Sequence, residues 1–305
     1  MECVNNRSEV REFLSSRRAK IRPEQAGVAL YGQRRRVPGL RREEVAQLAG
    51  VSTDYYTRLE KGDLAGASES VLHAIAEALR MDEAERAHLF DLARAARSSN
   101  REPRRRTQPA LRPSLQRILD SMTTTPAFIR NGRLDVLASN PLGRALYAPA
   151  FADPTQPANL ARFCFLDSAA TAFYPDWSDA ANTTVAILRT QAGRDPYDRQ
   201  LTDLVGELAT RSDAFRTRWA AHNVRLHRTG VKHFHHPVVG DLDLSFDALE
   251  LAAEPGLTLT AYTAEPGSSS EDKLAVLGSW SASGQPQEHA GSTEQGAQPR
   301  STQSR

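Results

Sequence analysis

The stretch REEVAQLAGVSTDYYTRLEKG, residues 42–62, constrains the fold more than any other part of the chain. Its apolar positions have helical spacing on both sides of a central glycine. Two short helices that cross closely need a small residue at their contact and a flexible residue at the turn, and Ala46 and Gly50 meet these needs. The remaining positions that such a pair must keep apolar are Val45, Ala49, Val51, Tyr56 and Leu59. The stretch therefore predicts a helix-turn-helix pair.

Such a pair is either a purely structural hairpin or a device that enters a DNA groove. The distribution of charge favours DNA. The net charge is only +2, but residues 1–112 hold 22 basic residues (Lys and Arg) against 16 acidic ones, whereas residues 113–305 hold 17 against 21. A positive first half suits a polyanion, because neutralisation of phosphates supplies much of the affinity for DNA. Double-stranded DNA is thus the expected partner.

The start of the second helix of the pair is expected to contact base edges, since this part of a recognition helix enters the major groove. Arg58 suits guanine O6 and N7, and Asp54 suits cytosine N4. An N-cap role for Ser52 is an equally good interpretation. The candidates for base contact are Ser52, Thr53, Asp54, Thr57 and Arg58.

Arginines before the pair are expected to contact phosphates. A run of charge is more often a solvated loop, and that alternative stays open for the first three members of the set. Glu60 does not suit phosphate, so we expect it to form a structural ion pair with Arg17 or Arg18. The candidates for phosphate contact are Arg34, Arg35, Arg36, Arg41 and Arg42.

Composition and periodicity divide the chain into four parts. Residues 7–97 are expected to form an all-α, five-helix helix-turn-helix domain with its motif at 42–61, in which Ser68 caps one helix and Asp82 with Glu85 caps the next. Residues 98–112 are basic and contain proline, as a linker does. A second domain is expected at 113–278. The tail, 279–305, is nearly free of apolar residues and is expected to be disordered.

The second domain alternates between strand and helix patterns. A helix is expected from about Pro113, followed by a hairpin whose turn, Asn131-Gly132, has positive φ at both positions. A mostly helical middle at 140–227 precedes three strands, including the alternating segments 241–249 and 256–264, and a short helix at 271–280. This order fits a five-stranded antiparallel sheet with helices on one face, and the whole chain is predicted to be an α+β multidomain protein.

The quoted motif resembles the helix-turn-helix of the Cro/cI-type (XRE) repressors, whose recognition helix is followed by an LxxLExG-like ending, as at residues 59–62. The longer run RRRVPGLRREEVAQLAGVSTDYYTRLEKG is similar to the MmyB-type regulators. Their second half also matches here, at VLASNPLGRALY (136–147), FYPDW (173–177), FRTRWAAHNVR (215–225) and HHPVVGDLDLSFDAL (235–249). The resemblance implies a PAS-like ligand-binding domain that holds fatty-acid-like molecules.

A pocket between the sheet and the helices is the usual place for such a ligand. His222 and His236 are expected either to be buried hydrogen-bonding partners around Trp219 or to donate to a ligand carboxylate. For every other residue of the set, ordinary core packing is the favoured interpretation. The candidates are Phe128, Val136, Asn140, Tyr147, Phe163, Phe165, Tyr174, Trp177, Trp219, His222, His236 and Phe246.

Chemistry by a metal or a catalytic site is not expected. Five histidines cluster at 222, 227, 233, 235 and 236, but strand alternation puts 236 on the opposite face from 233 and 235. No P-loop, HExxH or GxSxG motif is present. Cys3 and Cys164 are too few for a disulfide framework or a Cys-rich zinc site. No apolar run approaches the roughly 18 residues of a membrane span, so we expect a cytoplasmic protein without a membrane partner.

The sequence thus favours a transcription regulator that binds specific DNA as a homodimer and responds to a small apolar or fatty-acid-like effector, with no other cofactor. One alternative is a ligand-independent DNA-binding protein whose second half serves dimerisation or partner binding. A metal-dependent enzyme built on the histidines is a remote alternative.

Overall fold

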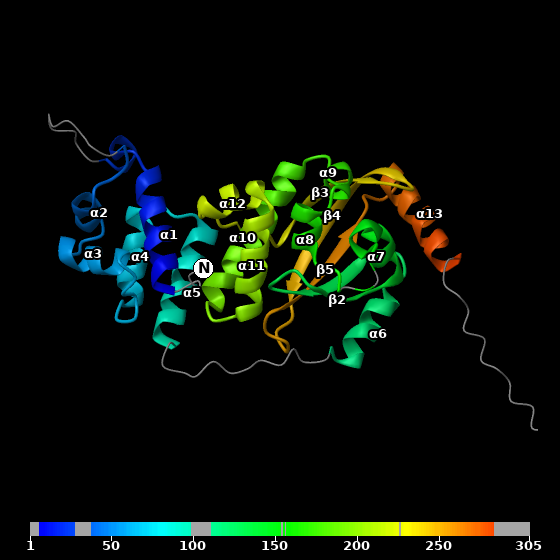
Figure 1. Cartoon of the computed structure of the whole chain (residues 1–305), viewed down its shortest axis with the longest axis horizontal. Helices are drawn as coiled ribbons and strands as arrows, with labels where there is room; N and C mark the ends of the chain where they lie inside the picture. The colour runs from blue at the N-terminus through cyan, green and yellow to red at the C-terminus, as the bar shows by residue number, and fades with distance from the viewer. Residues whose placement is uncertain are drawn as a thin grey trace, which may run out of the picture.

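The computed structural model describes residues 6–27, 38–98, 111–153, 155, 157–225 and 227–283 (Figure 1). The predicted tail therefore lies almost wholly outside the described residues, as do Arg34, Arg35 and Arg36. Most of the predicted linker lies outside them too, and the exact domain boundaries stay predictions. Among the described helices, none is long and apolar enough to cross a membrane.

The first half is helical in all its described elements. These are α1 (Asn6–Lys20), the 3-10 helix η1 (Pro23–Ala26), α2 (Arg42–Leu48), α3 (Thr53–Glu60), α4 (Glu69–Ala78) and α5 (Glu83–Ser98). Apolar side chains at helical spacing, such as Phe13, Leu72 and Ile75, are buried in one shared core. Ser68 accepts a hydrogen bond from Val71 N at the start of α4, and Asp82 and Glu85 cap α5 reciprocally, as predicted.

The second half combines a sheet with helices. Its elements are α6 (Pro113–Ser121), β1 (Ala127–Asn131), β2 (Val136–Ser139), α7 (Pro141–Leu146), η2 (Ala148–Phe151), α8 (Leu160–Leu166), α9 (Ala169–Phe173), α10 (Trp177–Arg194), α11 (Arg199–Arg211), α12 (Asp213–Ala220), β3 (Thr229–His236), β4 (Gly240–Glu250), β5 (Leu257–Thr263) and α13 (Ser269–Ser283). The strands pair antiparallel in the order β2-β1-β5-β4-β3. The predicted α+β architecture and five-stranded antiparallel sheet are confirmed.

Alternation along the strands gives the sheet two different faces. Phe128, Phe234, Leu244 and Tyr262 point into the large core beneath the helices. Ile129 of β1 and its cross-strand partner Leu259 of β5 pack instead with Leu115 and Leu119 of α6, on the opposite face. The prediction of helices on one face is therefore incomplete, because α6 covers the outer face at β1 and β5. The expected docking of the last helix is confirmed, since Ser270 of α13 accepts a hydrogen bond from Asp243 N of β4 at 2.9 Å.

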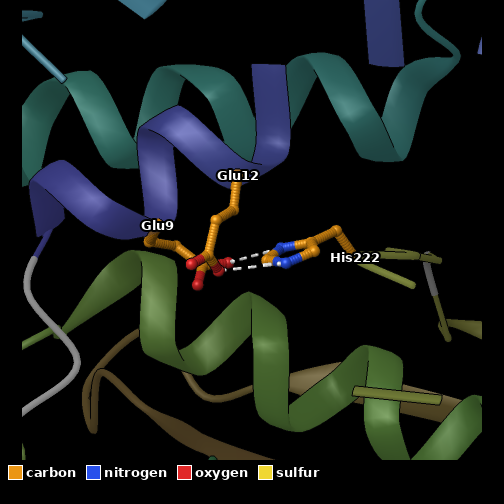
Figure 2. Close-up of side chains that lie close together, drawn as sticks. All are labelled: Glu9, Glu12 and His222. Atoms are coloured by element: carbon orange, nitrogen blue, oxygen red, sulfur yellow. Dashed lines mark ion pairs between the residues drawn. The ribbon is translucent and has the colours of Figure 1, made fainter. Parts of the chain in front are cut away.

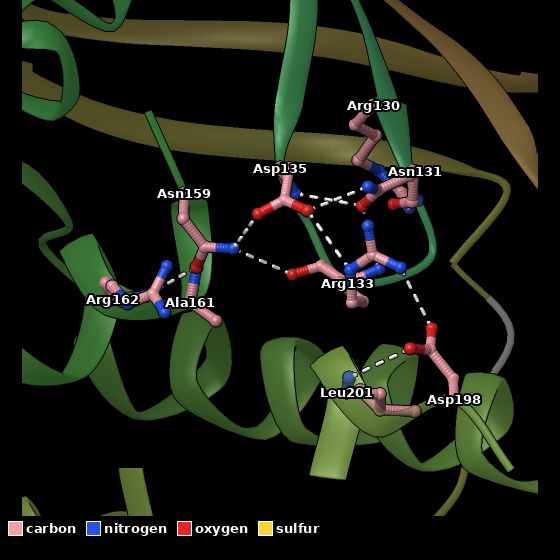
Figure 3. A network of polar contacts seen from close by, with 9 residues as sticks. All are labelled: Arg130, Asn131, Arg133, Asp135, Asn159, Ala161, Arg162, Asp198 and Leu201. Carbon is pink, nitrogen blue, oxygen red and sulfur yellow. Dashed lines mark hydrogen bonds and ion pairs between the residues drawn. The ribbon is translucent and has the colours of Figure 1, made fainter. Parts of the chain in front are cut away.

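The turn between β1 and β2 differs from the prediction. Positive φ falls at Leu134, at 67°, and not at Asn131 or Gly132. The Asn131 side chain explains the difference, because its Oδ1 accepts hydrogen bonds from Arg133 N (2.9 Å) and Asp135 N (3.0 Å) and so shapes a longer turn. Figure 3 shows this turn tied to two helices, since Arg133 pairs with Asp198 at 2.9 Å and Asn159 donates to Asp135 at 2.8 Å.

Helix α10 lies between the two halves of the molecule. In Figure 1 it stands with α11 and α12 between the first five helices and the sheet. It packs against α5 on the side of the first half and against α8 and α12 within the second. The same helix therefore contacts both the helix-turn-helix half and the core above the sheet.

Candidate DNA-binding surface and ligand cavity

Helices α2 and α3 form the predicted pair through a glycine turn. Gly50 has φ 65°, and Val51 N donates to Ala46 O at 3.0 Å while Gly50 N donates to Gln47 O at 3.2 Å. These two bonds close α2 in a Schellman motif, which needs a residue with positive φ at the position of Gly50. Ala46 is buried where the helices meet. The chain therefore folds here as its small residues and glycine predict.

The start of α3 presents polar side chains to solvent. Ser52 acts as the N-cap, because its Oγ accepts a hydrogen bond from Tyr55 N at 3.2 Å. Thr53, Asp54 and Arg58 are exposed, and Thr57 is half-buried. The Arg58 guanidinium lies 5.4 Å from the ring centre of Tyr55. The polar start of α3 is thus free of the core. Contact of these five residues with bases stays a prediction.

A buried carboxylate fixes the tilt of α3. Glu60 is only 1% exposed, and it accepts two hydrogen bonds from Arg18 of α1 (2.9 and 3.0 Å) and two from Arg42 of α2 (3.1 and 3.2 Å). The predicted pair with Arg18 is confirmed, whereas Arg17 pairs with Glu85. Burial alone raises the pKa of Glu60, but the two guanidiniums bring it below its usual value. Glu60 therefore holds three helices together as an anion.

The predicted phosphate contacts are untested. Arg42 is exposed while paired with Glu60, and Arg41 is half-buried with its guanidinium 3.4 Å from Glu43. Both lie at the start of α2. Arg34, Arg35 and Arg36 fall outside the described residues.

A cavity of about 400 Å³ lies between α10 and the inner face of the sheet. Helix α10 contributes Thr183, Thr184 and Ile187 to its wall. The strands contribute aromatic side chains, including Phe246 and Tyr262. The volume and the mixed lining are those of a small-molecule site.

Two cations line this cavity without a carboxylate partner among the described residues. Arg130 is buried and donates only to Asn131 O, at 3.3 Å, and Lys232 Nζ lies 3.5 Å from the Tyr262 hydroxyl. Burial lowers the pKa of Lys232 to about 8 and that of Arg130 to about 10, and the Arg130 charge adds to the effect on Lys232. Burial likewise lowers the pKa of His227, which is half-buried in the same wall. Asp176 and Asp179 also line the cavity, and Asp179 pairs with Arg225, so among the described residues Arg130 and Lys232 are the lining cations that form no ion pair.

Sequence reasoning missed Arg130 and Lys232, although a signal was present. Lys232 shares the strand face of Phe234 and His236, and Arg130 shares that of Phe128. A basic residue on the apolar face of a strand is uncommon, since it must lose its hydration. The alternation of side chains along each strand therefore indicates that both basic residues point to the apolar face.

Only three of the twelve predicted pocket residues, Phe128, Tyr174 and Phe246, line the cavity described here. The rings of Tyr147, Phe163, Phe165, Trp177 and Trp219 pack against other rings: Tyr147 on Phe128, Phe163 on Phe173, Phe165 on both Trp177 and Phe215, and Trp219 on Phe215. Val136 packs against the same core. These aromatic side chains fill the core next to the cavity, and their contact with a ligand stays a prediction.

Asn140 was also predicted in the pocket, but its side chain serves the backbone. Its Oδ1 accepts from Gly143 N at 2.7 Å and Ala127 N at 3.0 Å. Its Nδ2 donates to Met122 O at 2.6 Å and Thr125 O at 2.7 Å. Asn140 therefore caps α7 and fixes the segment before β1, with no donor or acceptor left for a ligand.

The clustered histidines have different surroundings and different hydrogen-bonding partners. His233 and His235 are exposed and pair with Asp243 and Asp241 at 2.6 Å each. His236 is buried and donates from Nε2 to Ala145 O at 3.0 Å, while its Nδ1 accepts from Val238 N. His222 lies between α1 and α10, and neither it nor His236 lines the cavity.

The helix-turn-helix pair and the sheet domain with a cavity define a DNA-binding regulator that has a separate ligand-binding domain. The sequence matches the family described as helix-turn-helix domain over residues 17–89. Over residues 111–277, more than half of the chain, it matches the family described as MmyB-like transcription regulator ligand binding domain. The chain therefore belongs to the MmyB-like transcription regulators. A search for similar curated proteins finds no match.

Replacement of Glu60 by Gln is expected to lower the free energy of unfolding by about 3 kcal/mol, the low end of the cost of removing one partner of a buried ion pair. Because the pKa of Glu60 is lowered in the fold, its stabilisation is complete above the usual carboxyl pKa and is lost as pH falls through the lowered value. Chemical denaturation at neutral and acidic pH measures both effects. The matched control is Glu43→Gln, which removes an exposed carboxylate from α2. Equal unfolding of the two variants would contradict the role of Glu60.

Proposed function

We propose that this regulator binds an inverted-repeat DNA site as a homodimer, and that an organic anion with an apolar body, such as a fatty-acid-like carboxylate, modulates this binding from the cavity under α10. The observation that carries the ligand class is that Arg130 and Lys232, in an aromatic-walled cavity, form no ion pair with a carboxylate among the described residues.

The DNA part of the proposal rests on the exposed start of α3. Ser52, Thr53, Asp54 and Arg58 share a surface that the core does not use. A single recognition helix contacts few base pairs, and two-fold symmetry doubles the contacts when half-sites are inverted. A homodimer is therefore the state in which this surface gains sequence specificity.

The ligand part of the proposal rests on electrostatics. An unpaired charge in a poorly hydrated site is costly, and an anion that pairs with it recovers much of that cost. The Lys232 ammonium lies 5.4 Å from the ring centre of Phe246 and 5.9 Å from that of Tyr262, so the head-group site continues into aromatic surface. An amphiphilic anion matches both surfaces, whereas a neutral hydrocarbon leaves the cations unpaired.

The DNA surface is tested by Arg58→Ala. The substitution is expected to cost about 1–3 kcal/mol at one base pair and to relax specificity there, since a bidentate contact to guanine is lost. Arg42→Ala is expected to weaken binding to all sequences alike and to flatten the salt dependence. Fluorescence anisotropy with the preferred duplex and its single-base variants measures both.

Arg117→Ala is the control for these variants, because it removes an exposed positive charge from α6, outside the helix-turn-helix half. It should leave affinity and specificity unchanged. Identical behaviour of Arg58→Ala and Arg42→Ala would show that the recognition surface is misplaced.

The ligand class is tested by calorimetric titration with decanoate and with decanol, which differ in the charge of the head group. Decanoate is expected to bind more tightly, and Lys232→Met to weaken it by about 1.5–3 kcal/mol, roughly ten- to a hundredfold, as for a hydrogen bond to a charged group. Because the pKa of Lys232 is lowered to about 8, decanoate affinity should fall as pH rises through this region, while decanol affinity stays constant.

Lys273→Met serves as the control for that experiment, since Lys273 lies on α13 and donates to Asp241 O on the surface. It should bind decanoate like the unchanged protein. Equal affinities for decanoate and decanol, or full decanoate affinity in Lys232→Met, would exclude an anion as the ligand.

A further inference from the structure

Helix α10 presents opposite faces to the cavity and to the helix-turn-helix half. Thr183, Thr184 and Ile187 line the cavity. At 100° per residue, Arg189 falls about 180° from their mean direction, and Gly193 lies one turn further along the same opposite face. A displacement of α10 by a bound molecule would thus also move Arg189 on the opposite face of the helix.

Arg189 joins the two halves through a buried guanidinium. It is 0% exposed, and its Nη1 donates to Glu9 of α1 and to His222 Nδ1, the latter at 2.9 Å. Its Nη2 donates to Trp219 O, and the guanidinium lies 4.0 Å from the Trp219 ring centre. An arginine does not lose its proton in a protein, so this charge requires its partners.

Glu9 is held as the matching anion. Burial raises the pKa of Glu9, but the neighbouring imidazoles of His222 and His88 and the Arg189 charge bring it well below its usual value. Burial lowers the pKa of His88, which lies 3.7 Å from Glu9 and keeps a neutral ring there. The charge of Arg189 is therefore balanced from the other half of the molecule.

Glu9, Glu12 and His222 converge, as Figure 2 shows, and their oxygen and nitrogen atoms lie within 4.8 Å of one another. Such a trio suits a metal ion in principle. Here Arg189 already donates to Glu9 and to His222 Nδ1, so Nε2 carries the imidazole proton and donates to Glu12 at 3.1 Å. The arrangement is complete as an ion-pair cluster, and a cation would have to sit beside a guanidinium.

The segment 222–225 makes a second connection between the same places. His222 has φ 51°, an uncommon value for a residue with a side chain, and its carbonyl accepts a hydrogen bond from Arg17 of α1. Val224 is buried in the core of α1–α5. Arg225, the next residue, lines the cavity and pairs with Asp179 of α10 at 2.7 Å. Two residues of one short segment therefore reach opposite sides of the interface.

We infer that the cluster of Arg189, Glu9 and His222, together with segment 222–225, is the joint through which occupancy of the cavity changes the placement of the DNA-binding helices; this inference rests on the proposed function. An organic anion beside Arg130 and Lys232 attracts Arg225 away from Asp179. Val224 and His222 contact the first half of the chain. A shift of Arg225 therefore changes the free energy with which the helix-turn-helix half packs on α10, the docked arrangement. DNA affinity responds only if the docked and undocked arrangements differ in their affinity for the anion.

The close approach at Gly193 offers a way to disturb this joint without changing a charge. A Cβ at this position would lie 2.5 Å from His88 Cε1 of α5, closer than carbon atoms pack. Gly193→Ala also favours the helix itself, since alanine has the higher helix propensity. This substitution therefore acts on the interface and spares both the cavity and α3.

The test compares the full chain with Arg189→Met and Gly193→Ala, using decanoate and the preferred duplex. In the unchanged protein, decanoate is expected to change the Kd for DNA by about fivefold or more, as typical coupling energies imply. Both variants should bind decanoate within about twofold of the unchanged protein and lose its effect on DNA. Hydrogen exchange should also become faster in α1, because its contact with α10 is weakened.

The control is Arg228→Met, which removes an exposed ion pair between the second half and α5, with Glu83 at 3.2 Å. It should keep the full response, because exposed pairs contribute little. If both variants respond to decanoate as the unchanged protein does, the joint is overturned while the proposed function stands. If decanoate does not bind the unchanged protein, the proposed ligand class fails, and exchange alone decides: equal protection of α1 in Arg189→Met overturns the joint.

Discussion

The contact between Arg189 and Glu9 is the interaction on which the arrangement of the molecule depends. A permanently charged guanidinium without solvent access is tolerable only while its anion is present, and that anion belongs to the other half of the chain. The helix-turn-helix half thus contacts α10 through this ion pair as well as through the packing of α5 on α10. The position of α3 is fixed in a similar way, by Glu60 between Arg18 and Arg42.

The same physical rule separates the cations that hold helices in place from those that we propose to bind a ligand. Arg18 and Arg189 have carboxylate partners and hold helices in place. Arg130 and Lys232 lie in a cavity without such partners among the described residues, and their lowered pKa values record the cost. This difference is the reason why we propose that an anion binds beside Arg130 and Lys232.

Local patterns predicted most of the fold, and long-range contacts decided what they missed. The turn at Gly50 was predictable because it depends on neighbouring residues. The prediction of a tight turn at Asn131 was wrong, because the Asn131 side chain accepts the hydrogen bonds that shape a longer turn. Most of the aromatic residues named for the pocket lie in the core beside the cavity, since large aromatic side chains also fill cores. The pairing of Glu9 with Arg189 had no signal in the sequence, because residues 180 positions apart meet only in the folded chain.

The account is tested most directly by selection of the full chain against a pool of random duplexes at moderate ionic strength, followed by affinity measurement on the enriched sequence with increasing decanoate. We expect enrichment of an inverted repeat, bound by two chains, with an affinity that changes as the cavity fills. Absence of any sequence preference over competitor DNA, both with and without decanoate, would contradict the claim that this chain is a ligand-responsive reader of DNA.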